Sequence, residues 1–164
     1  MLEQWPLLTS LLLLILVANG APVIAHYLLP SFAACPLDGG RCFADGRPWL
    51  GPSKTVRGLL ASLLLTTLAA PLLGLPVSTG ILIAVGAMLG DLLSSFVKRR
   101  LAITPSGMAL GIDQIPESLI PLLFVQSQFG LGVAAVIAIV AAFFLLELLL
   151  SRLLYRLHIR QQPW

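Results

Sequence analysis

Apolar runs separated by short polar segments make up most of this 164-residue chain. A bilayer core about 30 Å thick is crossed by about 20 apolar residues in a helix. Runs close to that length occupy residues 6–29, 59–75, 77–97 and 131–150, and Asn19-Gly20 and Pro22 interrupt the first of them. Because no positively charged region precedes the first run, the pattern favours an uncleaved helix over a signal peptide. Gly74-Leu75-Pro76 indicates a tight hairpin turn between the second and third runs.

A fifth run, at 115–129, is short, contains Pro116 and Pro121, and carries Glu117 and Gln126. It is either a kinked spanning helix or a re-entrant segment, which is tolerated where it is buried in protein or lines a wet cavity. The positive charges favour spanning, because Lys and Arg collect in cytoplasmic loops. With five spans, the loops 30–57 and 98–114 and the tail 151–164 share one side of the membrane. These three segments contain all ten cations of the chain, namely Arg41, Arg47, Lys54, Arg57, Lys98, Arg99, Arg100, Arg152, Arg156 and Arg160.

The sequence therefore predicts an all-α integral membrane protein, with residues 1–164 forming one membrane domain of five transmembrane helices. We expect the N-terminus outside and the C-terminus in the cytoplasm, in the cell (inner) membrane. Composition agrees, since 58% of residues are hydrophobic and 10% are charged, against about 25% charged in soluble domains. The cytoplasmic location of all ten cations explains the net charge of +3, which therefore indicates no nucleic-acid partner. Cys35 and Cys42 are too few for a disulfide framework or a zinc site, so free thiols are expected.

One apolar helix carries polar residues on a single face. Asp91, Ser94, Ser95 and Lys98 are spaced at i, i+3, i+4 and i+7. Seven helical residues place Asp91 about 10 Å deeper in the membrane than Lys98. A charge at that depth costs roughly 2.5–3.5 kcal/mol and is usually paired or functional. We expect a polar cavity open to the cytoplasm; the alternative is a structural Asp–Lys pair or an interhelical hydrogen bond.

Two further groups bear on this cavity. Lys98-Arg99-Arg100 ends the same helix, where membrane sidedness and the helix dipole both favour cations. Asp113 and Glu117 lie four residues apart at the start of the weak run, hence on one helical face. Two carboxylates with substrate phosphates are a typical Mg²⁺ site. The alternative is that these acids only complement the dipole of the helix N-terminus.

The loop 30–57 is the longest polar stretch. Its segment from Gly51 to Thr55 is similar to a P-loop but lacks the Walker spacing and a preceding strand. Lys54, Thr55 and Arg57 at the entry to a helix can still bind phosphate through backbone N–H groups, a hydroxyl and two cations. Anchoring to anionic lipid is the alternative. Asn19, alone in the first run, favours an interhelical hydrogen bond.

Several motifs together resemble the CDP-archaeol synthase family, which is similar to the CDP-diacylglycerol synthases. They are Ala18-Asn19-Gly20-Ala21-Pro22, Pro36-Leu37-Asp38-Gly39-Gly40, Asp45-Gly46-Arg47, the segment from Leu50 to Gly58, the segment from Gly90 to Arg100, and Asp113-Gln114. The resemblance covers nearly the whole chain in the same order. It implies a five-helix membrane core and transfer of a cytidylyl group from CTP to a lipid phosphate, with release of pyrophosphate and a requirement for Mg²⁺.

The resemblance also implies roles for individual residues. Asp91 and Asp113 are the implied metal-associated carboxylates, with Glu117 as a further candidate, and Lys98 is the implied catalytic cation. The implied substrate-binding residues are Asn19, Asp38, Lys54, Thr55, Arg57, Ser94, Ser95, Arg99 and Gln114. One position departs from the archaeal pattern, which has a second acid where this chain has Pro116. Either Glu117 replaces that acid, or the chain is a bacterial-type member with an altered lipid substrate.

We therefore expect a Mg²⁺-dependent CTP:lipid-phosphate cytidylyltransferase acting on an archaetidate-like or phosphatidate-like lipid. A non-catalytic lipid- or nucleotide-binding membrane protein is the main alternative. A CDP-alcohol phosphotransferase is disfavoured, because its DGxxAR…GxxxDxxxD signature is absent. A small transporter is also disfavoured, because the sequence shows no internal repeat of the kind many carriers have.

Overall fold

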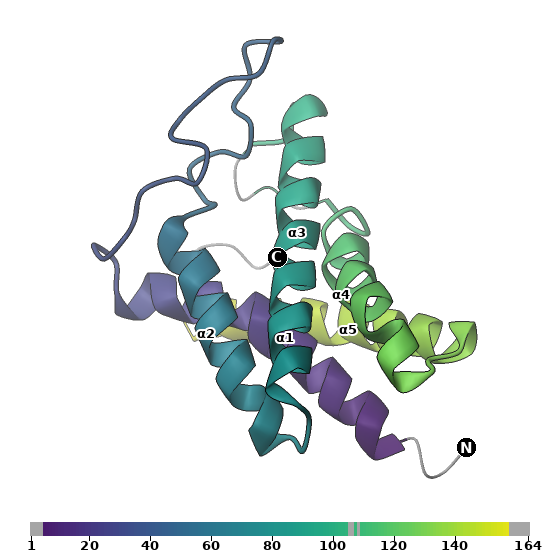
Figure 1. The fold of residues 1–164 in the computed structure, drawn as a ribbon. Coiled ribbons are helices and arrows are strands. Elements are labelled where there is room, and N and C mark those ends of the chain that lie inside the picture. The colour runs from purple at the N-terminus through teal and green to yellow at the C-terminus, as the bar shows by residue number, and fades with distance from the viewer. Residues whose placement is uncertain (1–4, 105–106, 108, 158–164) are drawn as a thin grey trace.

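A computed structural model describes residues 5–104, 107 and 109–157, and that part of the chain is helical as predicted (Figure 1). Its five helices are α1 (Trp5–Leu28), α2 (Val56–Leu72), α3 (Val77–Arg100), α4 (Gln114–Phe129) and α5 (Val133–Arg156). Within the described residues, α1, α3 and 133–153 of α5 are long and apolar enough to cross a membrane, while α2 is a shorter apolar helix. The predicted tail at 151–164 lies partly outside the described residues.

The first helix is continuous, as predicted for the run 6–29, because α1 continues through Pro22. A proline has no N–H, so the carbonyl four residues earlier, that of Ala18, loses its helical donor. The hydroxyl of Ser62 on α2 donates to this carbonyl oxygen at 2.8 Å. A neighbouring helix therefore satisfies the freed backbone group, which is how proline is tolerated inside apolar helices.

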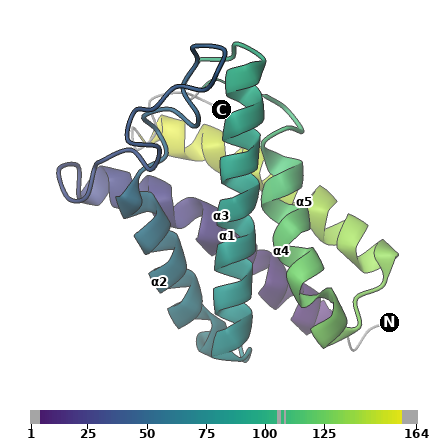
Figure 2. The ribbon, with the colours of Figure 1, turned by 45° about the horizontal axis from the view of Figure 1, so that its top comes forward.

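Helix α3 lies between α2 and α4 (Figures 1 and 2), and its glycines allow close approach on both sides. A Cβ atom at Gly80 would lie 2.9 Å from the backbone of α2, at Thr66 and Thr67. A Cβ atom at Gly86 would lie 2.5 Å from the Cα atom of Pro121 on α4. Small residues at such contacts let apolar helices pack backbone to backbone.

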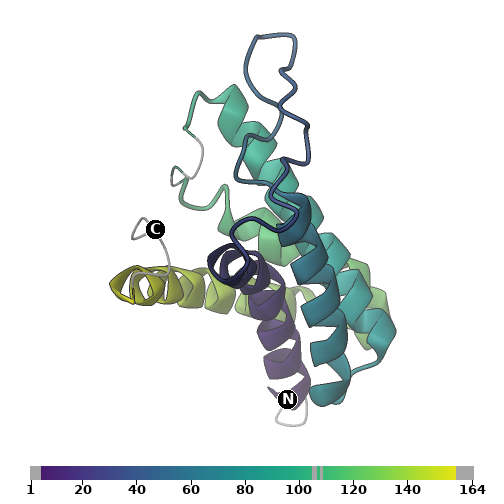
Figure 3. The same cartoon turned by 90° about the vertical axis from the view of Figure 1, so that its left-hand side faces the viewer.

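Two loops meet at the C-terminal end of α3. Residues 29–55 connect α1 to α2, and residues 101–113 connect α3 to α4. Figure 1 shows the first loop beside the upper end of α3, with the start of α2 below it. Helix α5 runs crosswise to α3 in Figures 1 and 3. The polar residues of the chain are thereby gathered where α2 and α4 begin and α3 ends.

Candidate active site

A cavity of about 640 Å³ lies among the helices and receives residues from all five. Apolar side chains such as Leu16, Val23 and Phe143 form part of its wall. Its polar wall brings together most of the residues that the sequence singled out. They are Asn19, Lys54, Thr55, Arg57, Asp91, Ser95, Lys98, Arg99, Asp113, Gln114 and Glu117.

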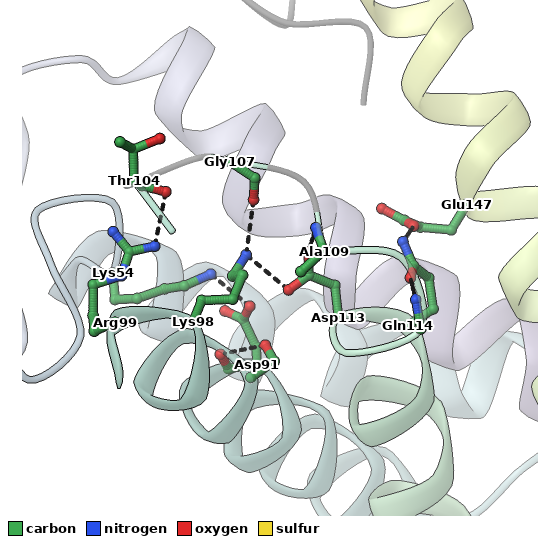
Figure 4. Close-up of polar contacts among 12 residues, drawn as sticks. Lys54, Asp91, Lys98, Arg99, Thr104, Gly107, Ala109, Asp113, Gln114 and Glu147 are labelled. Carbon is green, nitrogen blue, oxygen red and sulfur yellow. Dashed lines mark hydrogen bonds and ion pairs between the residues drawn. The ribbon is translucent and has the colours of Figure 1, made fainter. Parts of the chain in front are cut away.

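Lys54 reaches from the first loop to Asp91 on α3. Its Nζ lies 2.5 Å from Oδ1 of Asp91, and the two side chains are 20% and 19% exposed. Glu117, on α4, lines the same cavity and is close enough to Asp91 and Lys54 for their charges to interact. The first loop, α3 and α4 thus place one ammonium beside two carboxyl groups, and Figure 4 shows Lys54 and Asp91 meeting.

The charge of Lys54 is set by its neighbours. Burial alone would lower the pKa of Lys54, but the negative charges of Asp91, Glu117 and Asp113 outweigh burial and raise that pKa above its usual value. Lys54 is therefore a cation at neutral pH. A fixed positive charge in a partly dehydrated cavity is suited to binding phosphate groups.

A second ion pair joins the two ends of the loop between α3 and α4. Nζ of Lys98 lies 2.7 Å from Oδ1 of Asp113 and donates to the carbonyl of Gly107 at 3.3 Å (Figure 4). The backbone N–H of Ala109 donates to Oδ2 of Asp113 at 3.3 Å. Arg99 is held nearby, with Nη2 donating to the carbonyl of Thr104 at 2.9 Å. The ion pair therefore joins the C-terminal end of α3 to the residue just before α4, and both side chains line the cavity.

Glu147 on α5 also lines the cavity and was missed by the sequence analysis. Its Oε2 accepts a hydrogen bond of 2.7 Å from Nε2 of Gln114, and its Oε1 accepts one of 3.4 Å from Ser151. The Oε1 atom of Gln114 accepts from the backbone of Gly111 at 2.8 Å. Gln114 is thus occupied by protein on both sides of its amide and ties α4 to α5. A lone acid in the apolar run 131–150 was the available signal.

Several predicted substrate-binding residues have partners within the protein. The guanidinium of Arg57 donates to the carbonyls of Leu29 and Pro30 at 2.5 and 2.7 Å, and its Nη2 lies 2.7 Å from Nδ1 of His26. It therefore binds the C-terminal end of α1. The hydroxyl of Thr55 accepts from the N–H of Gly58 at 3.2 Å, as an N-cap of α2.

Asn19 and Ser94 bond mainly to their own helices. Nδ2 of Asn19 donates to the carbonyl of Ile15 at 3.0 Å, although the side chain also lines the cavity. The hydroxyl of Ser94 donates to the carbonyl of Asp91 at 3.0 Å, and Ser94 is buried and is not among the residues that line the cavity. Ser95, one position later, does line the cavity.

Asp38 organises the first loop from outside the cavity. Its Oδ2 accepts from the N–H groups of Leu50 and Gly51 at 3.0 and 2.9 Å, and its Oδ1 accepts from Gly40 at 3.0 Å. Partial burial would raise the pKa of Asp38, but these three backbone hydrogen bonds more than offset burial and lower the pKa below 3.8. The ionised carboxylate therefore stabilises the loop that carries Lys54.

We expect Asp38→Asn to loosen this loop at neutral pH, since an amide has one acceptor oxygen where the carboxylate has two. That oxygen can accept either from Leu50 and Gly51 or from Gly40, but not from both sides. Amide hydrogen exchange at the positions that lose their acceptor should accelerate by roughly tenfold. A lowered carboxylate pKa gives stability that is present above the unfolded value near 3.8 and is lost as pH falls through the lower folded value. Wild-type exchange protection should therefore fall only in that acidic range; equal protection in the mutant at neutral pH would contradict the role of Asp38.

The cavity carboxylates are chemically suited to Mg²⁺. They supply hard oxygen donors, and Mg²⁺ commonly takes one or two carboxylates together with substrate phosphates and water. Across residues 5–104, 107 and 109–157, no three His, Cys, Asp or Glu side chains form a group that could hold a metal by themselves. Cys35 and Cys42 are exposed and free, as expected.

A solved structure with a similar fold is described as an intramembrane enzyme for archaeal membrane lipids biosynthesis. The match has a TM-score of 0.75 and 33% sequence identity, and it covers 87% of this chain and 90% of that chain. Together with the apolar helices and the charged cavity, this similarity defines a multi-span membrane enzyme.

The sequence comparisons identify the family. The family model described as CarS-like, CDP-archaeol synthase, matches residues 7–164. The CDP-archaeol synthase of Sulfurisphaera tokodaii is 34% identical over 91% of this chain and 90% of its own length, and that of Pyrococcus furiosus is 32% identical over 90% of each. The Hyperthermus butylicus enzyme is 41% identical over 61% of this chain and 60% of its own length. The chain belongs to the CDP-archaeol synthase family.

Proposed function

We propose that this chain transfers the cytidylyl group of CTP to the phosphate monoester of a membrane lipid. An oxygen of the lipid phosphate attacks the α-phosphorus of CTP and forms the new P–O bond. The bond from that phosphorus to the oxygen bridging to the β-phosphate breaks, so the products are a CDP-lipid and pyrophosphate. The observation that supports this most directly is one cavity in which Lys54 and Lys98 face Asp91, Asp113 and Glu117, in a chain of this family.

The cations of the cavity bind the phosphates. Lys54, Lys98 and Arg99 come from the first loop and the end of α3, and all three line the cavity. They hold the triphosphate and stabilise the charge that develops on the leaving pyrophosphate. Phosphoryl-type transfer depends largely on positioning and electrostatics, so no covalent nucleophile is required.

Mg²⁺ is the proposed cofactor, with Asp91 and Asp113 as its ligands. Glu117 lies beside Asp91 and takes the place of the acid that the archaeal pattern has at Pro116. When bound, the metal supplies neutralisation of phosphate charge.

The membrane arrangement is also a proposal. All five helices cross the cell (inner) membrane, with the N-terminus outside and the cavity open to the cytoplasm, because this places every cation of the chain on the cytoplasmic side. CTP then enters from water. The acceptor lipid enters from the leaflet past apolar wall residues such as Leu16 and Val23.

The acceptor is proposed to be an isoprenoid ether lipid phosphate, because the matched relatives are named CDP-archaeol synthases. With purified protein, labelled CTP and Mg²⁺, we expect pyrophosphate release to depend on the added lipid phosphate. An archaeol-type phosphate should be used at least about tenfold better than a diacyl phosphatidate. A preference for phosphatidate would contradict the proposed acceptor. No turnover with either lipid would instead favour a lipid- or nucleotide-binding protein.

A further inference from the structure

Two arginines join the first loop to the end of α3 by binding each other's backbone. Nη1 of Arg47 donates to the carbonyls of Arg99 and Arg100, at 3.5 and 2.5 Å. Nη2 of Arg100 donates to the carbonyls of Arg47 and Pro48, at 3.2 and 2.5 Å. The last carbonyls of a helix have no partner within the helix and carry the negative end of its dipole, so a cation is favourable there.

The side chains around Arg100 make a second set of contacts. Its Nη1 lies 2.5 Å from Oδ1 of Asp45. The guanidinium also lies over the rings of Phe43 and Phe96, at 4.9 and 5.0 Å from their centroids. The ring of Trp49 packs edge-on against Phe43 at 5.2 Å. One planar guanidinium with several donors can satisfy a carboxylate, two carbonyls and two aromatic faces together, which an ammonium group cannot.

Asp45, Arg47 and Arg100, here called the clasp, are connected to the cavity through the rest of the loop. Asp38 accepts hydrogen bonds from the N–H groups of Leu50 and Gly51, which follow Arg47 closely in the first loop. The N–H of Leu37 then donates to the carbonyl of Lys54 at 2.8 Å. These hydrogen bonds fix the backbone on both sides of the segment 50–54.

The first loop is therefore attached to α3 at two points. One is the ion pair of Lys54 with Asp91, and the other is the clasp at Arg100. Nine helical residues separate Asp91 from Arg100, which is about 14 Å along the axis. Figure 3 shows this loop running along the end of α3. Because a helix is rigid over that length, the clasp fixes where the loop can deliver the ammonium group of Lys54.

We propose that the clasp is a positioning device, which holds Lys54 in the cavity and thereby sets the affinity for CTP. This inference rests on the proposed function. Asp45, Arg47 and Arg100 are not among the residues that line the cavity, so they act through Lys54 and do not touch the nucleotide. Without the clasp, the conformational entropy lost on ordering the loop would reduce the free energy of CTP binding. The clasp also gives a role to Asp45-Gly46-Arg47, to which the sequence analysis assigned none.

The test is Arg100→Gln, which removes the ion pair with Asp45 and leaves the hydrogen-bonding capacity of one amide. We expect KM for CTP to rise about tenfold, with kcat at saturating CTP and lipid changing by less than about twofold. Arg100→Lys should recover only part of the affinity. Arg41→Gln is the matched control, because Arg41 lies exposed in the same loop and the described contacts involve only its backbone. It should leave both constants unchanged.

A double-mutant cycle with Lys54→Gln separates positioning from direct contact or general destabilisation. If the clasp acts through Lys54, Arg100→Gln should raise KM little further once Lys54 is gone. An unchanged KM in Arg100→Gln, or a full additional rise in the Lys54→Gln background, would overturn the proposal.

Limited chymotrypsin digestion tests the clasp even if CTP is not the substrate. Cleavage after Phe43 and Trp49, in the loop held by the clasp, should be at least about tenfold faster in Arg100→Gln than in wild type or Arg41→Gln. Equal cleavage rates would overturn the clasp itself. Faster cleavage in a protein whose wild type does not use CTP would support the clasp and reject the proposed function.

Discussion

Replacing Asp91 by Asn is expected to lower turnover of CTP by about 10³-fold or more, because it removes a carboxylate from the centre of the charged cavity. Asp91 is the residue that Lys54 contacts directly, and Glu117 lies beside it. The amide keeps the size of the side chain and an oxygen that can accept from Lys54. Packing is therefore retained while the negative charge is lost.

Three measurements distinguish a catalytic role for Asp91 from a structural one. The thermal unfolding midpoint of Asp91→Asn in detergent should stay close to the wild-type value even though turnover of CTP falls. The reason is that Lys54 retains Glu117 and Asp113 as counter-charges. Raising the concentration of Mg²⁺ should not restore turnover in Asp91→Asn. Asp91→Glu, which keeps the charge but moves it by one methylene, should retain part of the activity. If Asp91→Asn turns over at the wild-type rate, the assignment of Asp91 as a metal ligand is wrong.

The helical class was predictable because hydrophobic run length is a direct requirement of the bilayer. The hydrogen bond that satisfies the backbone of α1 at Pro22 was not, since it comes from Ser62, a residue more than forty positions away on another helix. Helix propensity alone disfavours a proline inside a helix, and the hydrogen bond from Ser62 to the carbonyl of Ala18 offsets this at Pro22. Whether α2 and α4 cross the membrane stays a prediction, because length and hydropathy alone identify α1, α3 and α5 within the described residues.

The charged residues of the site were predictable as a set, but their pairing was not. The spacing of Asp91 and Lys98 suggested that these two could pair along one helix face. In the structure, Asp91 pairs with Lys54 and Lys98 with Asp113, and each pair joins two segments distant in sequence or separated by a loop. Residues two helical turns apart are about 10 Å apart, which is too far for direct contact. Partner choice is therefore a property of how the loops fold over α3.

The meeting of Glu117 with Asp91 depends on a glycine that sequence reasoning left unexplained. A Cβ atom at Gly90 would overlap the carbonyl oxygen of Pro116 and lie 2.5 Å from its carbonyl carbon and 2.7 Å from the nitrogen of Glu117. These are backbone atoms of the first turn of α4, so no side-chain rotation can relieve the overlap. Gly90 thus sets how closely the two carboxyl-bearing helices approach.

Gly90→Ala is accordingly expected to displace α4 from α3 and to impair both stability and activity. Overpacking of this kind costs about 1–3 kcal/mol, which should lower the unfolding midpoint in detergent by several degrees. A shift of about 1 Å in the cavity carboxylates can cost about 10²-fold in rate, so turnover of CTP should fall more than stability alone explains. The assay is turnover at a temperature well below the new midpoint, where the mutant remains folded.

Gly20→Ala provides the matched control for stability. Gly20 lies within α1, and an added Cβ atom would meet no heavy atom within 4 Å. Alanine is favoured over glycine inside a helix by about 1 kcal/mol, so the midpoint of Gly20→Ala should stay the same or rise. The same substitution should therefore have opposite effects at two helical glycines, because only Gly90 faces the backbone of another helix. A midpoint for Gly90→Ala that matches the control would show that α3 and α4 do not need this close approach.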